Sequence, residues 1–157
     1  MYLLDEQAVH APPDICFEVA ADIERWPEIL PHYRWVKFRE KAGFAQGTVE
    51  MAAWRDFVGP VRYPTWWLSE MAHDPEKRHV YYQHVGGITR GMDVRWEVLG
   101  TGSDTSHINL IHEWEGPAWP AVGRLAANLV IGPHFVSFIA QRTLAGVARE
   151  AEARTGP

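Results

Sequence analysis

The chain has 157 residues, the length of a single domain, and its 22 % charged and 46 % apolar residues are ordinary for a soluble globular protein. Its net charge of −5 argues against nucleic acid or an anionic membrane surface as a partner, since both repel an acidic protein. Eight tryptophans are many for this length, and they indicate either aromatic walls around a cavity or interface, or the filling of a core.

The cysteine content bears on the compartment. Cys16 has no second cysteine to pair with, which excludes an internal disulfide and is typical of a reducing environment. The opening residues, MYLLDEQ, lack the basic segment and the apolar segment of a signal peptide. We therefore expect a cytoplasmic protein that forms one domain over residues 1–157.

The first elements are short. Leu3–Ala11 alternates loosely between apolar and polar residues and predicts a strand. Pro12-Pro13-Asp14 predicts the start of a helix, because proline is tolerated in the first turn and the helix dipole favours an acidic residue there. Asp22 is the expected cap of a second short helix, Ile23–Ile29.

From Tyr33 onward, apolar residues recur with a period of two, and glycine or proline falls at regular intervals between the runs. This pattern is typical of an antiparallel meander. The predicted strands are Tyr33–Glu40, Gly47–Phe57, Tyr63–His73, Arg78–Val85, Thr89–Leu99 and Ser106–Glu115. The turns that separate them are expected at Lys41-Ala42-Gly43, Gly59-Pro60, Asp74-Pro75, Gly86-Gly87 and Gly100-Thr101-Gly102.

The last quarter of the chain, Trp119–Arg154, predicts one long helix. Between Val122 and Gln141 only Arg124 is charged, and apolar residues such as Leu125 recur at helical spacing, so the helix should be buried nearly all round. Gly132-Pro133 should kink or break it once, because a proline has no amide hydrogen to donate. The uncharged run is near the lower limit for crossing a bilayer and contains polar residues, so we expect no membrane span.

These elements favour one arrangement. An open antiparallel sheet of about seven strands has one face to bury, and the long apolar helix is the matching partner. We predict an α+β fold in which a curved seven-stranded antiparallel sheet, with two short helices after its first strand, wraps around the C-terminal helix. A hydrophobic cavity should lie between the sheet and that helix.

Two segments resemble a known family. HAPPDICFEVAADIERWPEILPHYRWVKF (His10–Phe38) resembles the opening of the polyketide cyclase/dehydrase family, within the START-like, birch-pollen-allergen-like superfamily. GRLAANLVIGPHFVSFIAQRTLAGVAREAE (Gly123–Glu152) is similar to the closing helix of bacterial members. The resemblance covers essentially the full chain and implies the helix-grip fold, a hydrophobic small-molecule ligand and no cofactor. It leaves two roles open, a cyclase/aromatase or a lipid, quinone or isoprenoid carrier, and either a monomer or a homodimer.

The resemblance also implies site residues. In aromatase/cyclases a motif tryptophan and the next tyrosine line the pocket, and these positions hold Trp26 and Tyr33 here. A W-x-S-x-R pattern in those proteins supplies a serine and an arginine, whereas this chain reads Trp67-Leu68-Ser69-Glu70-Met71, with Met71 at the arginine position. The expected ligand-binding residues are Trp26, Trp67, Ser69, Met71, Tyr82, Met92, Trp96, Trp114, Phe135 and Phe138.

Cyclising and dehydrating a poly-β-ketone requires a polarised carbonyl, removal of a carbon-bound proton and a chain held in one conformation. Arg55 shares the strand parity of Met51, which is the inward face, and a desolvated guanidinium requires a partner. It therefore either polarises a ligand carbonyl, in place of the arginine missing at Met71, or is turned to solvent by strand twist.

His112 lies on the apolar parity of the last strand. An imidazole that titrates near neutrality is suited to accept a proton, although an inward histidine is also common as a hydrogen-bonded core residue. With Tyr33 as a donor to ligand oxygen, Arg55, His112 and Tyr33 are the predicted catalytic residues. On the strand that holds Tyr82 and His84, alternation does not decide which side chains face inward.

Other chemistries lack their motifs. The histidines occur singly, without HExxH or paired cysteines, so no metal site is expected. No glycine-rich phosphate loop precedes a helix, which argues against a nucleotide cofactor.

Overall fold

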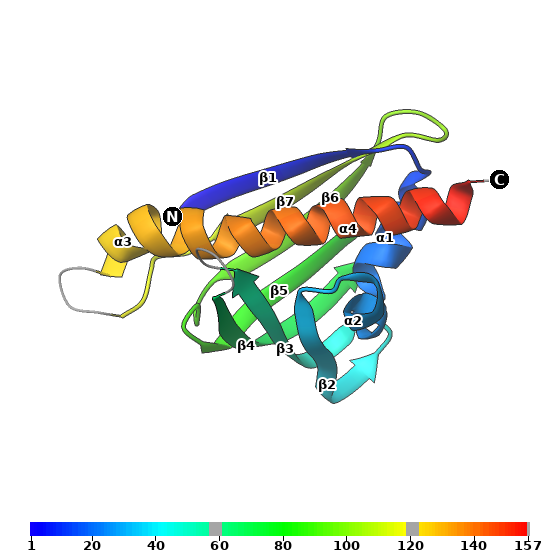
Figure 1. The fold of residues 1–157 in the computed structure, drawn as a ribbon. Helices are drawn as coiled ribbons and strands as arrows, with labels where there is room; N and C mark the ends of the chain where they lie inside the picture. Colours follow the sequence, from blue (N-terminus) through cyan, green and yellow to red (C-terminus); the bar gives the residue numbers. More distant parts are fainter. Residues whose placement is uncertain (57–60, 119–122, 157) are drawn as a thin grey trace.

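The computed structural model of the protein describes residues 1–56, 61–118 and 123–156, without the side chains of residues 124, 126–130 and 133. The elements follow the predicted order of one strand, short helices, six strands and a long helix (Figure 1). Their bounds are β1 (Tyr2–Val9), α1 (Pro13–Ala21), η1 (Ile23–Arg25), α2 (Trp26–Ile29), β2 (Tyr33–Gly43), β3 (Gln46–Asp56), β4 (Arg62–Asp74), β5 (His79–Gly87), β6 (Asp93–Gly100), β7 (Ser106–Glu113), α3 (Gly123–Ala126), η2 (Ala127–Val136) and α4 (Ser137–Thr155).

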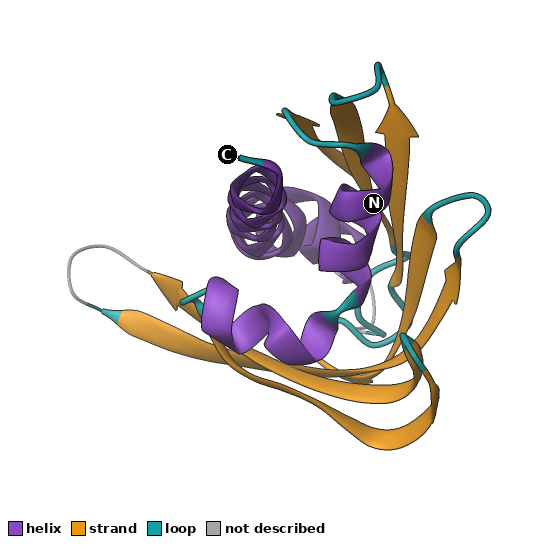
Figure 2. Cartoon of the chain, turned by 90° about the vertical axis from the view of Figure 1, so that its right-hand side faces the viewer, coloured by secondary structure: helices purple, strands orange, loops and turns teal. Residues whose placement is uncertain are grey.

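All seven strands form one antiparallel sheet in the order β1-β7-β6-β5-β4-β3-β2. The first strand therefore lies beside the last, with Tyr2 opposite Glu113. The sheet curves around the C-terminal helix, which Figure 2 shows nearly end-on. The predicted α+β helix-grip architecture is confirmed.

Two predicted turns were wrong. Lys41–Gly43 belongs to β2, and the turn falls instead at Phe44–Ala45, because Gly43 pairs with Gln46 across the hairpin. Gly86-Gly87 ends β5, and the turn is formed by residues 88–91, so β6 begins at Asp93 rather than at Thr89. The predicted turn at Gly59-Pro60 lies outside the described residues.

The long helix packs through the residues that its periodicity predicted. Ala140, Leu144 and Val147 of α4, which recur at the helical spacing of the predicted apolar stripe, are buried in the core. Its first part differs from the prediction. Leu125, expected in the core, is 60 % exposed, because the helix at this point extends beyond the groove.

Gly132-Pro133 does not end the helix. The pair lies within η2, a π-helical stretch, so the α-helical hydrogen-bond pattern is interrupted there while the helix continues. The predicted helix start at Trp119 lies outside the described residues. None of the helices that the structure describes has an apolar stretch long enough to cross a bilayer.

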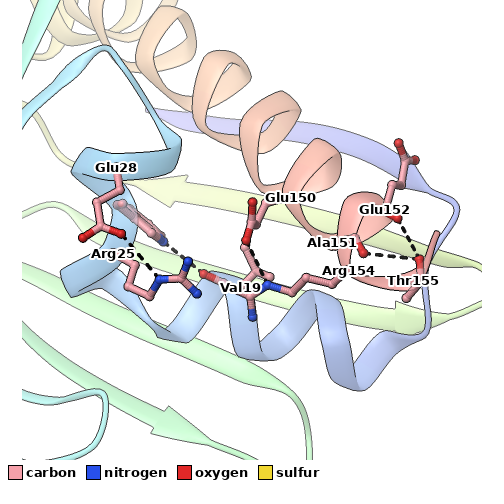
Figure 3. A network of polar contacts seen from close by, with 9 residues as sticks. Val19, Arg25, Glu28, Glu150, Ala151, Glu152, Arg154 and Thr155 are labelled. Carbon is pink, nitrogen blue, oxygen red and sulfur yellow. Dashed lines mark hydrogen bonds and ion pairs between the residues drawn. The ribbon is translucent and has the colours of Figure 1, made fainter. Parts of the chain in front are cut away.

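The ends of the helices are fixed by a few polar contacts. Asp22 precedes η1 as predicted, but its side chain makes no capping hydrogen bond. At the end of α4, Arg154 donates to Glu150 and the Thr155 hydroxyl donates to the carbonyls of Ala151 and Glu152 (Figure 3). The Thr155 hydroxyl thus contacts carbonyls of the last helical turn, which a helix end otherwise leaves partly to water.

Candidate functional site

A cavity of about 120 Å³ lies between the concave face of the sheet and the C-terminal helix. Its walls are mainly aromatic and aliphatic. The residues that line it are Trp26, Tyr33, Met51, Thr65, Trp66, Trp67, Tyr82, His84, Ile88, Thr89, Met92, Val94, Trp96, Leu110, His112, Ile131, Phe135, Val136, Ile139, Ala140 and Thr143. The cavity thus draws on α2, on strands of the sheet, on the β5–β6 turn and on the helix.

Aromatic rings form a continuous wall. The ring of Trp26 lies 5.3 Å from that of Tyr33 and 5.7 Å from that of Trp96, and Tyr33 lies 6.1 Å from Trp67. These centroid distances are typical of favourable aromatic pairs. The indole nitrogen of Trp26 donates to the carbonyl of Val19, 3.1 Å away, so its only donor is used within the protein. Trp26 therefore provides shape and apolar surface.

The structure brings together most of the residues expected at the site. Tyr33 and His112 of the predicted catalytic set line the cavity. Of the predicted ligand-binding residues, the cavity wall includes Trp26, Trp67, Tyr82, Met92, Trp96 and Phe135. Their roles in binding or catalysis remain predictions.

Four expected ligand-binding residues lie outside the described cavity wall. Ser69 and Met71 face the same side of β4 as Trp67, but they are packed in the core further along the strand. Trp114 lies beyond the end of β7, where its indole nitrogen donates to the Arg90 carbonyl at 3.0 Å. Phe138 on α4 packs instead against the guanidinium groups of two arginines.

Arg55 is buried, as its parity predicted, yet it does not line the cavity that the described residues form. Its Nε donates to the backbone carbonyl of His134. Its guanidinium carbon lies 4.2 Å from the ring centre of Phe135 and 5.6 Å from that of Phe138. Burial lowers the pKa of the guanidinium, and an arginine side chain remains charged in proteins. It ties β3 to the C-terminal helix.

Three polar side chains face the cavity from two strands that are separated by β6. Tyr82 and His84 are on the inward face of β5, and His112 is on β7. The hydroxyl of Tyr82 and Nδ1 of His112 are buried with no hydrogen-bond partner among the described residues. Buried polar groups are usually paired, so unpaired ones in a cavity wall are candidates to meet a ligand.

Burial decides the charge of these histidines. It lowers the pKa of His112 to about 4, and together with the nearby His112 it lowers the pKa of His84 to about 3. Both imidazoles are therefore neutral at pH 7, and each has one nitrogen that can accept a hydrogen bond and one that can donate. Burial also raises the pKa of Tyr82, which keeps its hydroxyl protonated.

Tyr33 is engaged differently. Its hydroxyl lies 3.3 Å from the hydroxyl of Thr143, which also lies 3.0 Å from Nε2 of His32 and donates to the Ile139 carbonyl at 2.8 Å. Burial, and after it the charge of Arg142, lowers the pKa of His32 to about 4. Thr143 thus joins α4 to the start of β2 and fixes Tyr33 in the cavity wall.

Sequence reasoning missed several wall residues. Met51 and His84 have the inward parity, but the prediction assigned Met51 no ligand role and left the facing of His84 open. Thr89 was expected at a strand start and Ile88 was assigned to no element, whereas both lie in the turn between β5 and β6 and line the cavity. Thr143 lies at helical spacing from Ala140 and Val147, but it was missed because a threonine gives no apolar signal.

Metal ligands are not gathered at the site. Within the described part of the chain, no three His, Cys, Asp or Glu side chains are placed to hold a metal ion.

Comparison with known proteins agrees with this architecture. Residues 9–132 match the model of a family described as polyketide cyclase/dehydrase and lipid transport. By sequence, no curated protein matches the chain significantly.

Several solved structures share the fold. The ZhuI aromatase/cyclase of Streptomyces sp. R1128 is 22 % identical, with a TM-score of 0.78 over 99 % of this chain and 96 % of that one. The protein TTHA0849 of Thermus thermophilus is 20 % identical, with a TM-score of 0.78 over 99 % and 100 %. A norcoclaurine synthase point mutant of Thalictrum flavum, in complex with a transition state analogue, is 17 % identical, with a TM-score of 0.72 over 99 % and 96 %. Identities this low establish the fold and leave the activity to be argued from the site.

Proposed function

The chain belongs to the polyketide cyclase/dehydrase and lipid-transport family, and from this premise we propose that it is a cofactor-free cyclase/dehydratase acting on a polyketide-like ligand. The ligand would bind in the cavity between the sheet and the helix. The reaction would be an aldol cyclisation followed by loss of water.

One observation carries this proposal: polar side chains converge on an otherwise apolar cavity. His84, His112 and Tyr82 face it from two strands, and the Tyr82 hydroxyl has no partner among the described residues. A carrier that holds its ligand only by shape needs a wall of apolar side chains, whereas unpaired polar groups in such a wall cost free energy unless a ligand pairs with them. The wall is thus better suited to catalysis than to carriage.

The chemistry requires a base for a carbon-bound proton. His112 is neutral because of its burial, so an imidazole nitrogen has a lone pair available. Removing a proton between two carbonyls produces an enolate, and this negative charge would raise the pKa of the imidazolium beside it. The enolate carbon then attacks a second carbonyl, and the alkoxide that forms takes the proton back from His112. In the dehydration, His112 would remove a second carbon-bound proton and donate it to the new hydroxyl, which leaves as water as the carbon–carbon double bond forms.

Hydroxyl groups would stabilise the enolate oxygen. Tyr82 is the better candidate, because its hydroxyl is unpaired among the described residues, while that of Tyr33 is engaged by Thr143. A donor aimed at a developing oxyanion is worth more in a site that excludes water. Tyr33 would mainly hold the ligand ring between Trp26 and Trp67.

The cavity volume limits the ligand portion that it holds. Its 120 Å³ is close to the engineered cavity of about 150 Å³ that binds benzene. We therefore infer that the cyclising end of the ligand, about one ring in size, occupies the cavity. The remainder of a longer chain would lie outside it or displace wall side chains.

A carrier role is the second candidate, and one observation favours it. None of the described residues that line the cavity is an arginine or lysine, because Arg55 binds the helix and Met71 replaces the family arginine. A carrier would bind a lipid, quinone or isoprenoid and release it unchanged.

The test uses the N-acetylcysteamine thioester of a linear poly-β-ketone, with products analysed by mass spectrometry. The wild type should produce a cyclic compound lighter than the substrate by one molecule of water. His112→Gln should slow this by about a hundredfold or more. His107→Gln is the matched control, since His107 lies on the same strand but pairs with Glu6 on the outer face. Substrate that binds yet is recovered unchanged would favour the carrier, and a substrate that does not bind would count against both roles.

A further inference from the structure

We propose that His84 binds an oxygen atom of the ligand and that Thr89 positions the His84 side chain. The Thr89 hydroxyl donates to Nδ1 of His84, so that the imidazole proton stays on Nε2, which faces the cavity. The expected ligand is a small aromatic ketone whose carbonyl accepts this hydrogen bond. The inference rests on the proposed function in that it takes the cavity as the ligand site.

The turn between β5 and β6 holds Thr89 in place. His84 N donates to the Met92 carbonyl at 2.8 Å, Gly91 N to the His84 carbonyl at 2.7 Å, and Met92 N to the Thr89 carbonyl at 3.0 Å. Gly87 and Gly91 have φ angles of 92° and 86°, which favour glycine. The turn is therefore tightly closed, and its conformation places Thr89 over the side chain of His84.

The contact itself is short. Oγ1 of Thr89 lies 2.6 Å from Nδ1 of His84, and both residues line the cavity. The face of the imidazole stacks on the indole of Trp67, with 6.1 Å between centroids and 14° between planes. The indole thus fixes the plane of the ring, and the hydroxyl fixes its rotation within that plane. Nε2 is the nitrogen left to meet a ligand.

The position of the single imidazole proton decides whether Nε2 donates or accepts a hydrogen bond. A neutral imidazole has one N–H, and a nitrogen that accepts a hydrogen bond cannot carry it. Burial and the nearby His112 lower the pKa of His84 and keep it neutral. If the Thr89 hydroxyl donates to Nδ1, the proton is on Nε2, and the partner there must be an acceptor such as a ligand oxygen.

The surroundings select the kind of oxygen. No arginine or lysine is among the described lining residues, so a carboxylate would enter without a counter-charge and at a large desolvation cost. A carbonyl oxygen needs only neutral donors, and Tyr82, two residues before His84 on the same face, offers a second. The indoles of Trp67 and Trp96 would pack against an attached ring. These features together select a neutral aromatic ketone.

The test uses two probes of matched shape: acetophenone, which has a carbonyl, and α-methylstyrene, which has a CH₂ group in its place. ¹⁵N NMR of the histidine side chains reports the His84 tautomer in the ligand-free protein. The variants are His84→Phe, which keeps a ring, Thr89→Val, which removes the hydroxyl at similar volume, and Thr89→Ser, which keeps it.

We expect the wild type and Thr89→Ser to have the His84 proton on Nε2, and Thr89→Val to show a mixture of tautomers. Acetophenone affinity should fall about tenfold in His84→Phe and a few-fold in Thr89→Val, while α-methylstyrene affinity stays unchanged in both. A proton on Nδ1 in the wild type would overturn the assignment, and so would equal losses for the two probes. If neither probe binds the wild type, the cavity fails as a ligand site, and the tautomer measurement still decides the role of Thr89.

Discussion

Arg55 donates a hydrogen bond to the backbone carbonyl of His134, so that a side chain of β3 holds the π-helical segment of the C-terminal helix. The two residues are 79 positions apart in the chain. A π-helical stretch departs from regular α-helical pairing, and a charged donor from the sheet supports it there. Arg55 thus has a structural role at the edge of the cavity wall, where it holds the C-terminal helix to β3.

This contact predicts that Arg55 contributes mainly to stability. Arg55→Met keeps the apolar stem but loses a charge-assisted hydrogen bond and two cation–π contacts, and should lower the free energy of unfolding by about 2–4 kcal/mol. Arg62→Met is the control, because Arg62 is an exposed arginine paired with Asp56, and it should cost under about 1 kcal/mol. Urea denaturation measures both. If the two variants were equally stable and only Arg55→Met lost turnover, Arg55 would be a catalytic residue instead.

The buried histidines predict a loss of stability in mild acid. Burial lowers the pKa of His32 and His112 to about 4 and that of His84 to about 3, against 6.5 for a free side chain. Between pH 6.5 and about 4 the unfolded chain binds protons that the folded chain does not, so stability falls as pH falls. Each histidine contributes about 1.4 kcal/mol per pH unit, or about 4 kcal/mol per unit for the three.

Denaturation between pH 7.5 and 5, where most carboxylates remain ionised, should reveal this slope. His112→Gln should reduce it by about one third. His10→Gln, at an exposed histidine, serves as the matched control. A stability that is constant across this range would show that these histidines are not held neutral by burial.

A close approach between α4 and Leu30, the residue that follows α2, gives a packing prediction. A Cβ atom on Gly146 would lie 2.0 Å from Cδ2 of Leu30, which is fully buried. Gly146→Ala should therefore destabilise the protein by about 1–3 kcal/mol, although alanine is normally better than glycine inside a helix by about 1 kcal/mol. Combining it with Leu30→Ala, which opens the space, should cost less than the sum of the two single changes. Strict additivity would contradict the contact.

The fold could be predicted from the sequence because its signals are long and regular. The period of two from Tyr33 onward, with glycine or proline between the runs, predicts the sheet, and the apolar final helix is its partner. The errors fall where pairing between strands decides the outcome. The turn at Phe44–Ala45 and the end of β5 at Gly87 depend on cross-strand register, which a single strand does not reveal.

The site could be predicted only in part, for a similar reason. Trp26 and Tyr33 follow from the family resemblance, and His112 follows from alternation. His84 has the same inward facing as Tyr82, but its hydrogen bond to Thr89 depends on the closed turn between β5 and β6. The parity of Arg55 correctly indicated burial, whereas its partner, a helix carbonyl, has no signature in the sequence.

If the space between sheet and helix admits a ligand, a bound ligand must lie close to the methionine methyl groups that line this space. Of the chain's four methionines, Met51 and Met92 line the cavity, while Met71 is buried in the same core outside the described wall. With ¹³C-methyl-labelled methionine and acetophenone as the probe, we expect nuclear Overhauser contacts from the probe's ring protons to Met51 and Met92 and none to Met71. A probe that contacts neither Met51 nor Met92 at saturating concentration would contradict this expectation.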